Sequence, residues 1–136
     1  MITGIHHIAL ILSAEETLEF YKCLGFTESF RKARENDTIV LLDGYGIQLE
    51  VFIDNRHPKR PEGLSEPLGI RHLALKVDAP LEEIIDKIKE IIMQKQTPEL
   101  LEPQEKLNTG SIMTDWLGSR FVFIKDPDGN TLELHE

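Results

Sequence analysis

The segment Ile5-His6-His7-Ile8-Ala9-Leu10 decides the fold, because it returns later in the chain as Ile70-Arg71-His72-Leu73-Ala74-Leu75. The shared pattern is a histidine followed by an apolar residue, alanine and leucine, and it moves from position 7 to position 72, an offset of 65 residues. Self-similarity at a fixed offset is the signature of a repeated structural unit. The sequence therefore predicts two similar halves, each of which begins with the strand that carries this pattern.

A helix is predicted directly after each copy of the pattern. In the first half, Ser13 and Glu16 fit an S-x-x-E capping box, and Gly25 stands where the helix would end. In the second half, Pro80 lies near the first helical turn. The isoleucines after it keep the spacing of one buried stripe: Ile84, Ile85, Ile88, Ile91 and Ile92. Both helices are expected to pack on a sheet.

Three further strands are predicted after each helix. They are Glu28–Lys32, Thr38–Leu42 and Gly46–Ile53 in the first half, and Ser111–Asp115, Arg120–Ile124 and Thr131–His135 in the second. Turn residues precede the last strand of each half, at Asp43-Gly44 and at Asp126-Pro127-Asp128-Gly129. Each half is therefore predicted to be a βαβββ module, which gives an α+β protein.

The two modules are expected to form one domain spanning residues 1–136, a length that suits a single core. Module one covers about residues 1–53, a linker covers 54–69, and module two covers about 70–136. The linker carries a basic cluster, which we interpret as solvated in preference to anion-binding: Arg56, His57, Lys59 and Arg60. The segment Gln94–Thr109 holds two prolines and little periodicity, so it is expected to be an irregular connection or a lid.

Strand alternation places one histidine and one glutamate of each half on a common face. Residues two apart in a strand point to the same side, so His72 and Ala74 lie opposite the aliphatic Leu73. The glutamate of each last strand likewise lies opposite its leucine and valine neighbours. Four candidates therefore fall on the faces turned away from the helices: His7, Glu50, His72 and Glu133.

A divalent cation is the simplest partner for these side chains. A carboxylate that faces the inside of a curved sheet without a partner costs several kcal/mol. Two neutral imidazoles and two carboxylates supply four ligands, balance the charge of the ion and leave positions open for water or substrate. Mixed nitrogen and oxygen ligation suits Ni, Zn, Co, Mn or Fe(II) better than Mg or Ca.

The sequence resembles the vicinal oxygen chelate superfamily, the group of glyoxalase I, methylmalonyl-CoA epimerase, extradiol dioxygenases and the fosfomycin and bleomycin resistance proteins. The resemblance covers nearly the whole chain and rests on Ile5–Leu10, on Phe20-Tyr21 with Leu24-Gly25-Phe26, on Arg71–Val77 and on Phe121–Glu136. It implies a curved sheet of two βαβββ modules around a metal ion, usually in a homodimer. The ligands that it implies are His7, Glu50, His72 and Glu133.

The four-ligand pattern is most similar to that of small bacterial glyoxalase I-like proteins. Extradiol dioxygenases hold iron with two histidines and one carboxylate, and methylmalonyl-CoA epimerase has an amide at the position of Glu50. The resemblance implies a lactoylglutathione lyase-like metalloenzyme that moves a proton on a small hydroxy-carbonyl compound through an enediolate on the metal. Glu133 is the expected base and Glu50 the alternative. Glyoxalase I places an arginine where this chain has Ile11, which argues against glutathione, although a thiol hemithioacetal stays open.

Two other functions remain open at this point. An Fe(II) extradiol-type dioxygenase would consume oxygen strictly, whereas the lyase reaction would proceed without it. A non-catalytic ligand-binding protein of the resistance type would carry no stoichiometric metal, and such proteins typically lack the full ligand set.

Composition excludes several partners. Acidic residues outnumber basic ones, 24 against 15, and the net charge of −9 disfavours nucleic acid and anionic lipid. The single Cys23 excludes an internal disulfide, and no leader or apolar stretch of about 20 residues is evident, so a cytoplasmic protein with a small-molecule substrate is expected.

Several other residues are assigned structural roles or are left open. We expect His6 to be structural, and His57 and His135 to be solvated. Arg120 is a weaker candidate for an anionic substrate group. Trp116 is expected either to close over a site or to anchor the irregular segment.

Overall fold

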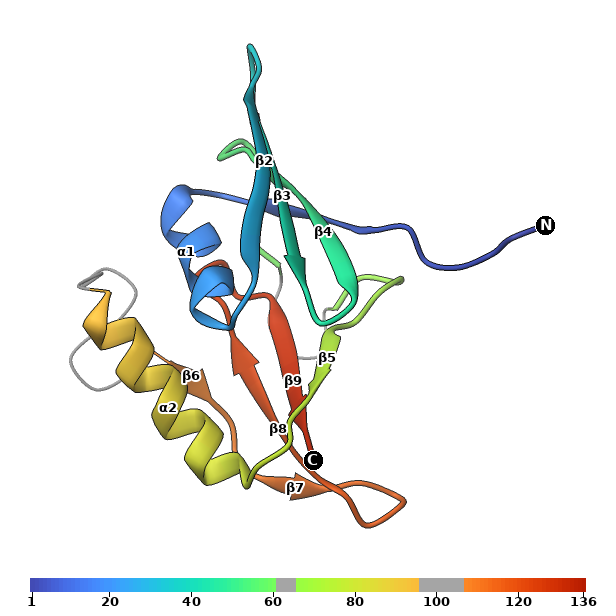
Figure 1. Ribbon diagram of the computed structural model, residues 1–136, viewed down its shortest axis with the longest axis vertical. Coiled ribbons are helices and arrows are strands. Elements are labelled where there is room, and N and C mark those ends of the chain that lie inside the picture. Colours follow the sequence, from blue (N-terminus) through green and yellow to red (C-terminus); the bar gives the residue numbers. More distant parts are fainter. Residues whose placement is uncertain (61–65, 96–106) are drawn as a thin grey trace. The chain divides into compact units, whose positions relative to one another are not determined.

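The computed structural model describes residues 1–60, 66–95 and 107–136 (Figure 1). These residues form two compact units, Met1–Pro58 and Lys59–Glu136. Each unit contains one four-stranded or five-stranded sheet and one α-helix. The α+β class and the repeated βαβββ order are therefore confirmed.

The first unit runs through β1 (Ile8–Leu12), α1 (Glu15–Cys23), β2 (Thr27–Ala33), β3 (Thr38–Gly44) and β4 (Ile47–Ile53). Its sheet has the order β1-β4-β3-β2. Strand β1 pairs with β4 in parallel, whereas the other neighbours are antiparallel. The first and last strands of the unit consequently lie side by side.

Alternating apolar residues build the core of this unit. Val40 and Leu42 of β3, and Leu49 and Val51 of β4, are fully buried, while their strand neighbours are half-buried or exposed. Helix α1 contacts β1 and buries one face that includes Phe20. Full burial of a large apolar side chain stabilises a fold by about 1.5–3 kcal/mol, so this alternation holds the helix on one face of the sheet.

The expected capping box of the first helix is wrong. The helix begins at Glu15, its N-cap is Ala14 in an extended conformation, and no side chain caps it. The carbonyl of Ala14 accepts the backbone N–H groups of Thr17 and Leu18. Glu15 and Glu16 place negative charge in the first turn, where it interacts favourably with the helix dipole.

Gly25 ends this helix region, as expected. Its φ of 107° lies in the region that favours glycine. A Cβ at this position would clash with the hydroxyl of Tyr45, which donates a hydrogen bond to the Leu24 carbonyl. Both the backbone angle and the close approach of Tyr45 therefore require glycine.

The turn between β3 and β4 lies two residues later than the expected Asp43-Gly44. Gly44 is still part of β3, and the turn is formed by Tyr45 and Gly46, with φ values of 56° and 74°. Two consecutive positive φ values are typical of the tight hairpin turns whose twist matches the flanking strands. Strand β4 therefore begins at Ile47 and not at Gly46.

The second unit contains β5 (Leu73–Lys76), α2 (Leu81–Gln94), β6 (Asn108–Thr109), β7 (Met113–Thr114), β8 (Arg120–Lys125) and β9 (Thr131–His135). The order of its sheet is β5-β9-β8-β6, and β7 also pairs with β8. Strands β5 and β9 are parallel, as β1 and β4 are in the first unit. The repeat in sequence is thus a repeat in topology.

The strand expected at Ser111–Asp115 is shorter, Met113–Thr114, and the separate strand β6 precedes it. Strands β6 and β7 pair with opposite ends of β8, as Thr109↔Ile124 and Met113↔Phe121 show. The pairing shifts by one residue between them, which indicates a β-bulge. Strand β2 of the first unit has a similar shift between Glu28 and Phe30, so the irregularity is repeated as well.

Helix α2 extends into the segment that we expected to be irregular. It ends at Gln94, and Asn108–Thr109 form β6, so both ends of Gln94–Thr109 have regular structure. Residues 96–106 of that segment, and residues 61–65 of the expected linker, lie outside the described residues.

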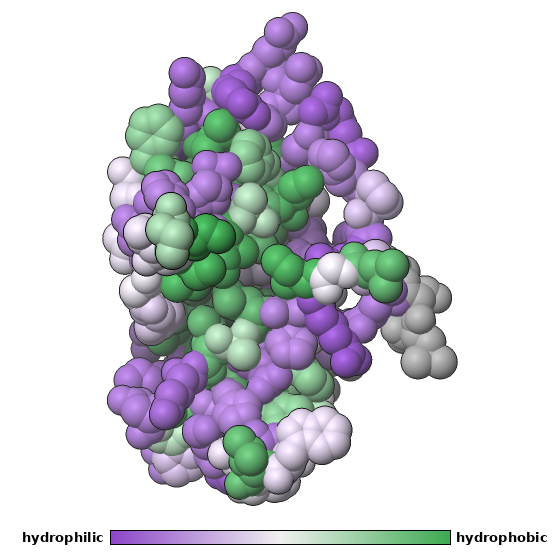
Figure 2. Space-filling model, turned by 90° about the vertical axis from the view of Figure 1, so that its right-hand side faces the viewer, coloured by the Kyte–Doolittle hydropathy of each residue, from purple (hydrophilic) through white to green (hydrophobic). Residues whose placement is uncertain are grey.

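The isoleucine stripe faces the interior, as predicted. Ile88 and Ile92 are buried, and Ile84, Ile85 and Ile91 are half-buried. Figure 2 shows that hydrophobic and hydrophilic side chains are mixed on the face that it presents. Within the described residues, neither helix has the length and apolar character needed to cross a lipid bilayer.

Glu136, directly after β9, caps helix α2. The backbone N–H of Leu81 donates to Glu136 Oε1 at 3.0 Å, while Arg120 Nε donates to Glu136 Oε2 at 2.9 Å. Arg120 Nη1 also donates to Glu82 Oε1 at 2.8 Å. The guanidinium lowers the pKa of the Glu136 carboxyl and of the Glu82 carboxyl. Arg120 therefore links α2 to the end of the sheet. This structural role accounts for Arg120 without an anionic substrate group.

Candidate functional site

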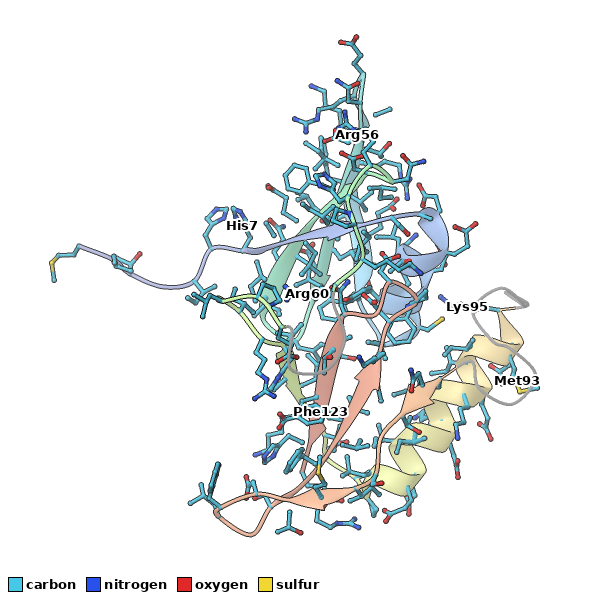
Figure 3. The ribbon with its side chains drawn as sticks, turned by 180° about the vertical axis from the view of Figure 1, so that it is seen from behind. His7, Arg56, Arg60, Met93, Lys95 and Phe123 are labelled. Carbon is cyan, nitrogen blue, oxygen red and sulfur yellow. The ribbon has the colours of Figure 1, made fainter. Side chains whose placement is uncertain are left out.

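The first unit brings His7 and Glu50 together. In the parallel pair of β1 and β4, Ala9 lies opposite Glu50, and His7 precedes Ala9 by two residues and so shares its side. His7 Nε2 lies 3.9 Å from Glu50 Oε1, and the two side chains are 36% and 30% exposed. Figure 3 shows His7 on the segment that leads into β1. One imidazole and one carboxylate are therefore available on an accessible face.

The second unit repeats this arrangement with His72 and Glu133. Ala74 of β5 lies opposite Glu133 of β9, and His72 precedes Ala74 by two residues. His72 Nε2 lies 2.9 Å from Glu133 Oε2, and the side chains are 23% and 13% exposed. This pair is closer and more buried than the pair in the first unit.

Each pair offers one imidazole nitrogen and one carboxylate oxygen. The two pairs together contain two imidazoles and two carboxylates. This set matches the mixed nitrogen and oxygen ligation that Zn and neighbouring divalent ions accept. Among residues 1–60, 66–95 and 107–136, no three His, Cys, Asp or Glu side chains form a group suited to a metal ion. Each unit therefore supplies two of the four predicted ligands.

A cavity of about 540 Å³ adjoins the second pair, within the second unit. Its walls include Arg71, Trp116, Phe121, Phe123, Glu133 and His135. Figure 3 labels Phe123 on β8. The carboxylate of Glu133 is thus both the partner of His72 and part of a cavity wall.

His135 lies in this cavity wall and is not the solvated terminal residue that we expected. Its Nε2 is 2.9 Å from Asp115 Oδ2 and 3.7 Å from Glu133 Oε1, and its Nδ1 is 2.9 Å from the Glu136 carbonyl oxygen. The hydrogen bond to this carbonyl, and then that to Asp115, raise the pKa of His135. One feature of the sequence does indicate this placement. His135 follows Glu133 by two residues, so the two side chains share a face of β9.

Asp115 links the strand to the loop that follows β7. Its Oδ1 accepts the backbone N–H groups of Leu117 and Ser119, each at 2.9 Å, while Oδ2 faces His135. The bond from Ser119 is the main cause that lowers the pKa of the Asp115 carboxyl. Sequence reasoning missed Asp115 as a site residue because its partners come from a loop and from β9.

Of the remaining histidines, His6 contacts the first pair and His57 lies in the basic linker. His6 Nδ1 lies 2.9 Å from His7 Nδ1. His57 Nε2 lies 3.2 Å from Asp54 Oδ2, and Arg56 donates from its Nε and Nη2 to the same carboxylate. These contacts favour a structural role for Arg56 and His57 over an anion-binding one.

Comparison with solved structures shows the same fold in proteins of distant sequence. Lactoylglutathione lyase from Agrobacterium tumefaciens is 19% identical, with a TM-score of 0.60 over 99% of this chain and 94% of that chain. The fosfomycin resistance protein FosX from Listeria monocytogenes, complexed with Mn(II) and a sulfate ion, is 17% identical, with a TM-score of 0.65 over 99% of this chain and 93% of that chain.

Nearer relatives cover almost the whole chain. The glyoxalase family protein from Enterococcus faecalis is 33% identical, with a TM-score of 0.79 over 98% of this chain and 97% of that chain. The uncharacterized protein YaeR of Escherichia coli (strain K12) is 31% identical over 141 residues, which cover 97% of this chain and 95% of that protein. Residues 4–134 match the family model, and the chain belongs to the Glyoxalase/Bleomycin resistance protein/Dioxygenase superfamily.

Proposed function

We propose that this protein is a metal-dependent lyase or isomerase of the glyoxalase type, which transfers a proton on a small hydroxy-carbonyl substrate. The observation that carries the proposal is the repeated pairing of a histidine with a glutamate across the first and last strands of each unit. A structural role explains one such pair easily. It does not explain why both units place the same two residue types in the same register.

The proposed ligands of one divalent ion are His7, Glu50, His72 and Glu133. Their donor atoms fit such an ion, because neutral imidazoles and carboxylates together satisfy a borderline cation and balance its charge. The Mn(II) complex of the distantly related FosX supports the choice of a divalent metal. When bound, the ion would stabilise the negative charge that develops on adjacent substrate oxygens as a carbon-bound proton leaves.

Glu133 is the proposed base. Its carboxylate is part of the cavity wall and is only 13% exposed, so it can reach a bound molecule in a partly desolvated setting. One carboxylate oxygen takes the proton from the substrate carbon and returns it to the neighbouring carbon, so the reaction involves no net oxidation. Glu50 is the alternative base, because the repeat gives it the equivalent place in the first unit.

The substrate proposal does not extend to glutathione. Ile11 occupies the place where the resemblance to glyoxalase I predicts an arginine, and its side chain on β1 is exposed and uncharged. The fold shared with lactoylglutathione lyase supports the class of reaction, while the absence of this cation argues for a different carrier or for none. A small compound with oxygens on adjacent carbons is the substrate class that the proposed chemistry needs.

The test combines elemental analysis with one conservative substitution. Protein purified without a metal-affinity tag is expected to contain a stoichiometric divalent metal, and Glu133→Gln is expected to reduce turnover of a hydroxy-carbonyl substrate by at least about a hundredfold. Glu90→Gln, on the exposed side of α2, is the matched control and should retain full activity. Unaltered turnover in Glu133→Gln would exclude Glu133 as the base.

A further inference from the structure

The cavity of the second unit has an aromatic floor. Phe121 and Phe123 lie on the same face of β8, with ring centroids 5.4 Å apart. In the antiparallel pairing with β9, they lie opposite His135 and Glu133 respectively. The imidazole of His135 stacks on Phe121 with an interplanar angle of 11° and a centroid distance of 6.0 Å. Phe121 and Phe123 meet edge to face, with an interplanar angle of 71°, so three aromatic rings lie next to one another along this wall.

The aromatic floor adjoins the proposed ligand pair. The imidazole of His72 lies 5.2 Å from the ring of Phe123, measured between centroids, and Glu133 pairs with Phe123 across the strands. A molecule whose oxygens meet His72 and Glu133 would consequently extend over the phenylalanine rings. The first unit lacks this arrangement, because Leu41 lies opposite Glu50.

The rim of the cavity carries an exposed indole. Trp116, the only tryptophan of the chain, is 99% exposed although it lines the cavity. Its loop is held by Asp115, which accepts two backbone N–H groups there, and by the turn at Gly118, whose φ is 85°. An indole held at the rim of a cavity can add apolar and stacking contact to a molecule bound there.

The size and charge of the cavity further limit the class of ligand that it can hold. Its volume of about 540 Å³ lies within the range of about 300–1,000 Å³ in which pockets hold drug-sized molecules, and it exceeds what a three-carbon compound fills. The cation in its wall, Arg71, is already paired with Glu66 at 2.9 Å, so an anionic group on the ligand is not required.

We infer that the substrate is an aryl-substituted hydroxy-carbonyl compound, whose ring packs against Phe121 and Phe123 beside Trp116 while its oxygens lie at His72 and Glu133. This inference rests on the proposed function for the orientation of the oxygens. The aromatic preference itself depends only on the rings of the second unit.

A matched pair of ligands tests the inference. 2-Hydroxyacetophenone and hydroxyacetone share the same adjacent hydroxyl and carbonyl groups and differ by a phenyl in place of a methyl. Their dissociation constants are measured by ligand-observed NMR on the full chain as purified and after addition of Zn(II). The phenyl compound is expected to bind at least about tenfold more tightly under both conditions, because its ring adds buried apolar area and stacking.

Three variants test whether the preference for the phenyl compound comes from the aromatic side chains of the cavity. Phe121→Leu and Trp116→Leu are each expected to weaken binding of 2-hydroxyacetophenone about three- to tenfold and to leave hydroxyacetone within about twofold. Phe30→Leu, at a half-exposed phenylalanine on β2 of the first unit, is the control and should change neither. Trp116→Leu alters a fully exposed side chain, so its result holds even where Phe121→Leu perturbs folding.

The outcomes separate this inference from the proposed function. Equal binding of the two ketones, or an equal loss in the Phe30→Leu control, would overturn the inference, whereas tighter binding of both ketones with Zn(II) would still support the proposed metal site. A phenyl preference combined with no tightening of either ketone by Zn(II) would support the inference and contradict the proposed function.

Discussion

At the scale of single residues, Glu133 lies between two imidazoles with different origins. His72 reaches one carboxylate oxygen at 2.9 Å, and His135 lies 3.7 Å from the other. Only His72 has a counterpart in the first unit, since the residue two positions after Glu50 is Phe52. The residues shared by both halves are the proposed ligands, and residues found only in the second half line the cavity together with Glu133.

The residues that both halves repeat could be predicted from the sequence, whereas those present in only one half could not. His7 and His72 were found because two copies of a pattern could be compared. His135 and Asp115 lie 20 residues apart and meet only through the fold, so no local pattern indicates their contact. The contacts of such residues depend on which strands pair and which side chains are buried. The sequence of one strand alone does not predict either.

Asp54, directly after β4, is expected to make a contribution to stability that is lost in acid. Hydrogen bonds from Arg56 hold the pKa of Asp54 well below its usual value. A depressed carboxyl pKa stabilises the folded state above the unfolded pKa of about 4, and this contribution is lost as the pH falls toward the folded value. Asp54→Asn is therefore expected to lower the free energy of unfolding at pH 7 and to lower it less at pH 3.

Urea denaturation of the wild type and the variant at both pH values measures this difference. Glu90→Gln, at an exposed position on α2, serves as the control and should show no such pH-dependent gap. A gap between the wild type and Asp54→Asn that is the same at pH 3 as at pH 7 would refute the role of the Asp54 charge.

At the scale of elements, the order of helices and strands followed from periodicity, whereas their ends did not. The isoleucine stripe predicted α2 because many residues contribute to one pattern. The start of α1, the turn at Tyr45-Gly46 and the break between β6 and β7 each depend on the conformation of one or two residues. Backbone hydrogen bonds and strand register, which come from tertiary pairing, decide those ends.

Gly25 allows a direct test of how the first helix ends. Alanine there meets both an unfavourable positive φ and a clash with the Tyr45 hydroxyl, so Gly25→Ala is expected to destabilise the protein by about 2–3 kcal/mol. Gly118→Ala is the matched control, because its φ is also positive but no atom lies within 4 Å of the added Cβ.

The control should cost about 1 kcal/mol, the backbone strain alone. Chemical denaturation of the wild type and both variants gives the two free-energy differences. Equal destabilisation by Gly25→Ala and Gly118→Ala would show that the contact with Tyr45 does not restrict this position.

At the scale of the whole molecule, the repeat provides two similar units with one ligand pair each. The sequence predicted the family fold because the repeat and the βαβββ order run through nearly the entire chain, and residues 4–134 match that family. We propose that one metal ion joins two such pairs, either within one chain or across the homodimer that the resemblance implies. Either assembly requires one metal ion per chain.

Metal stoichiometry shows whether both histidine–glutamate pairs hold the same ion. Elemental analysis after equilibration with Zn(II) is expected to find one ion per chain in the wild type and none in either His7→Ala or His72→Ala, because each variant removes a ligand from the same site. His57→Ala, which alters an imidazole bound to Asp54, should retain the ion. Two ions per chain, or retention of the metal after loss of either His7 or His72, would contradict a single site built from both pairs.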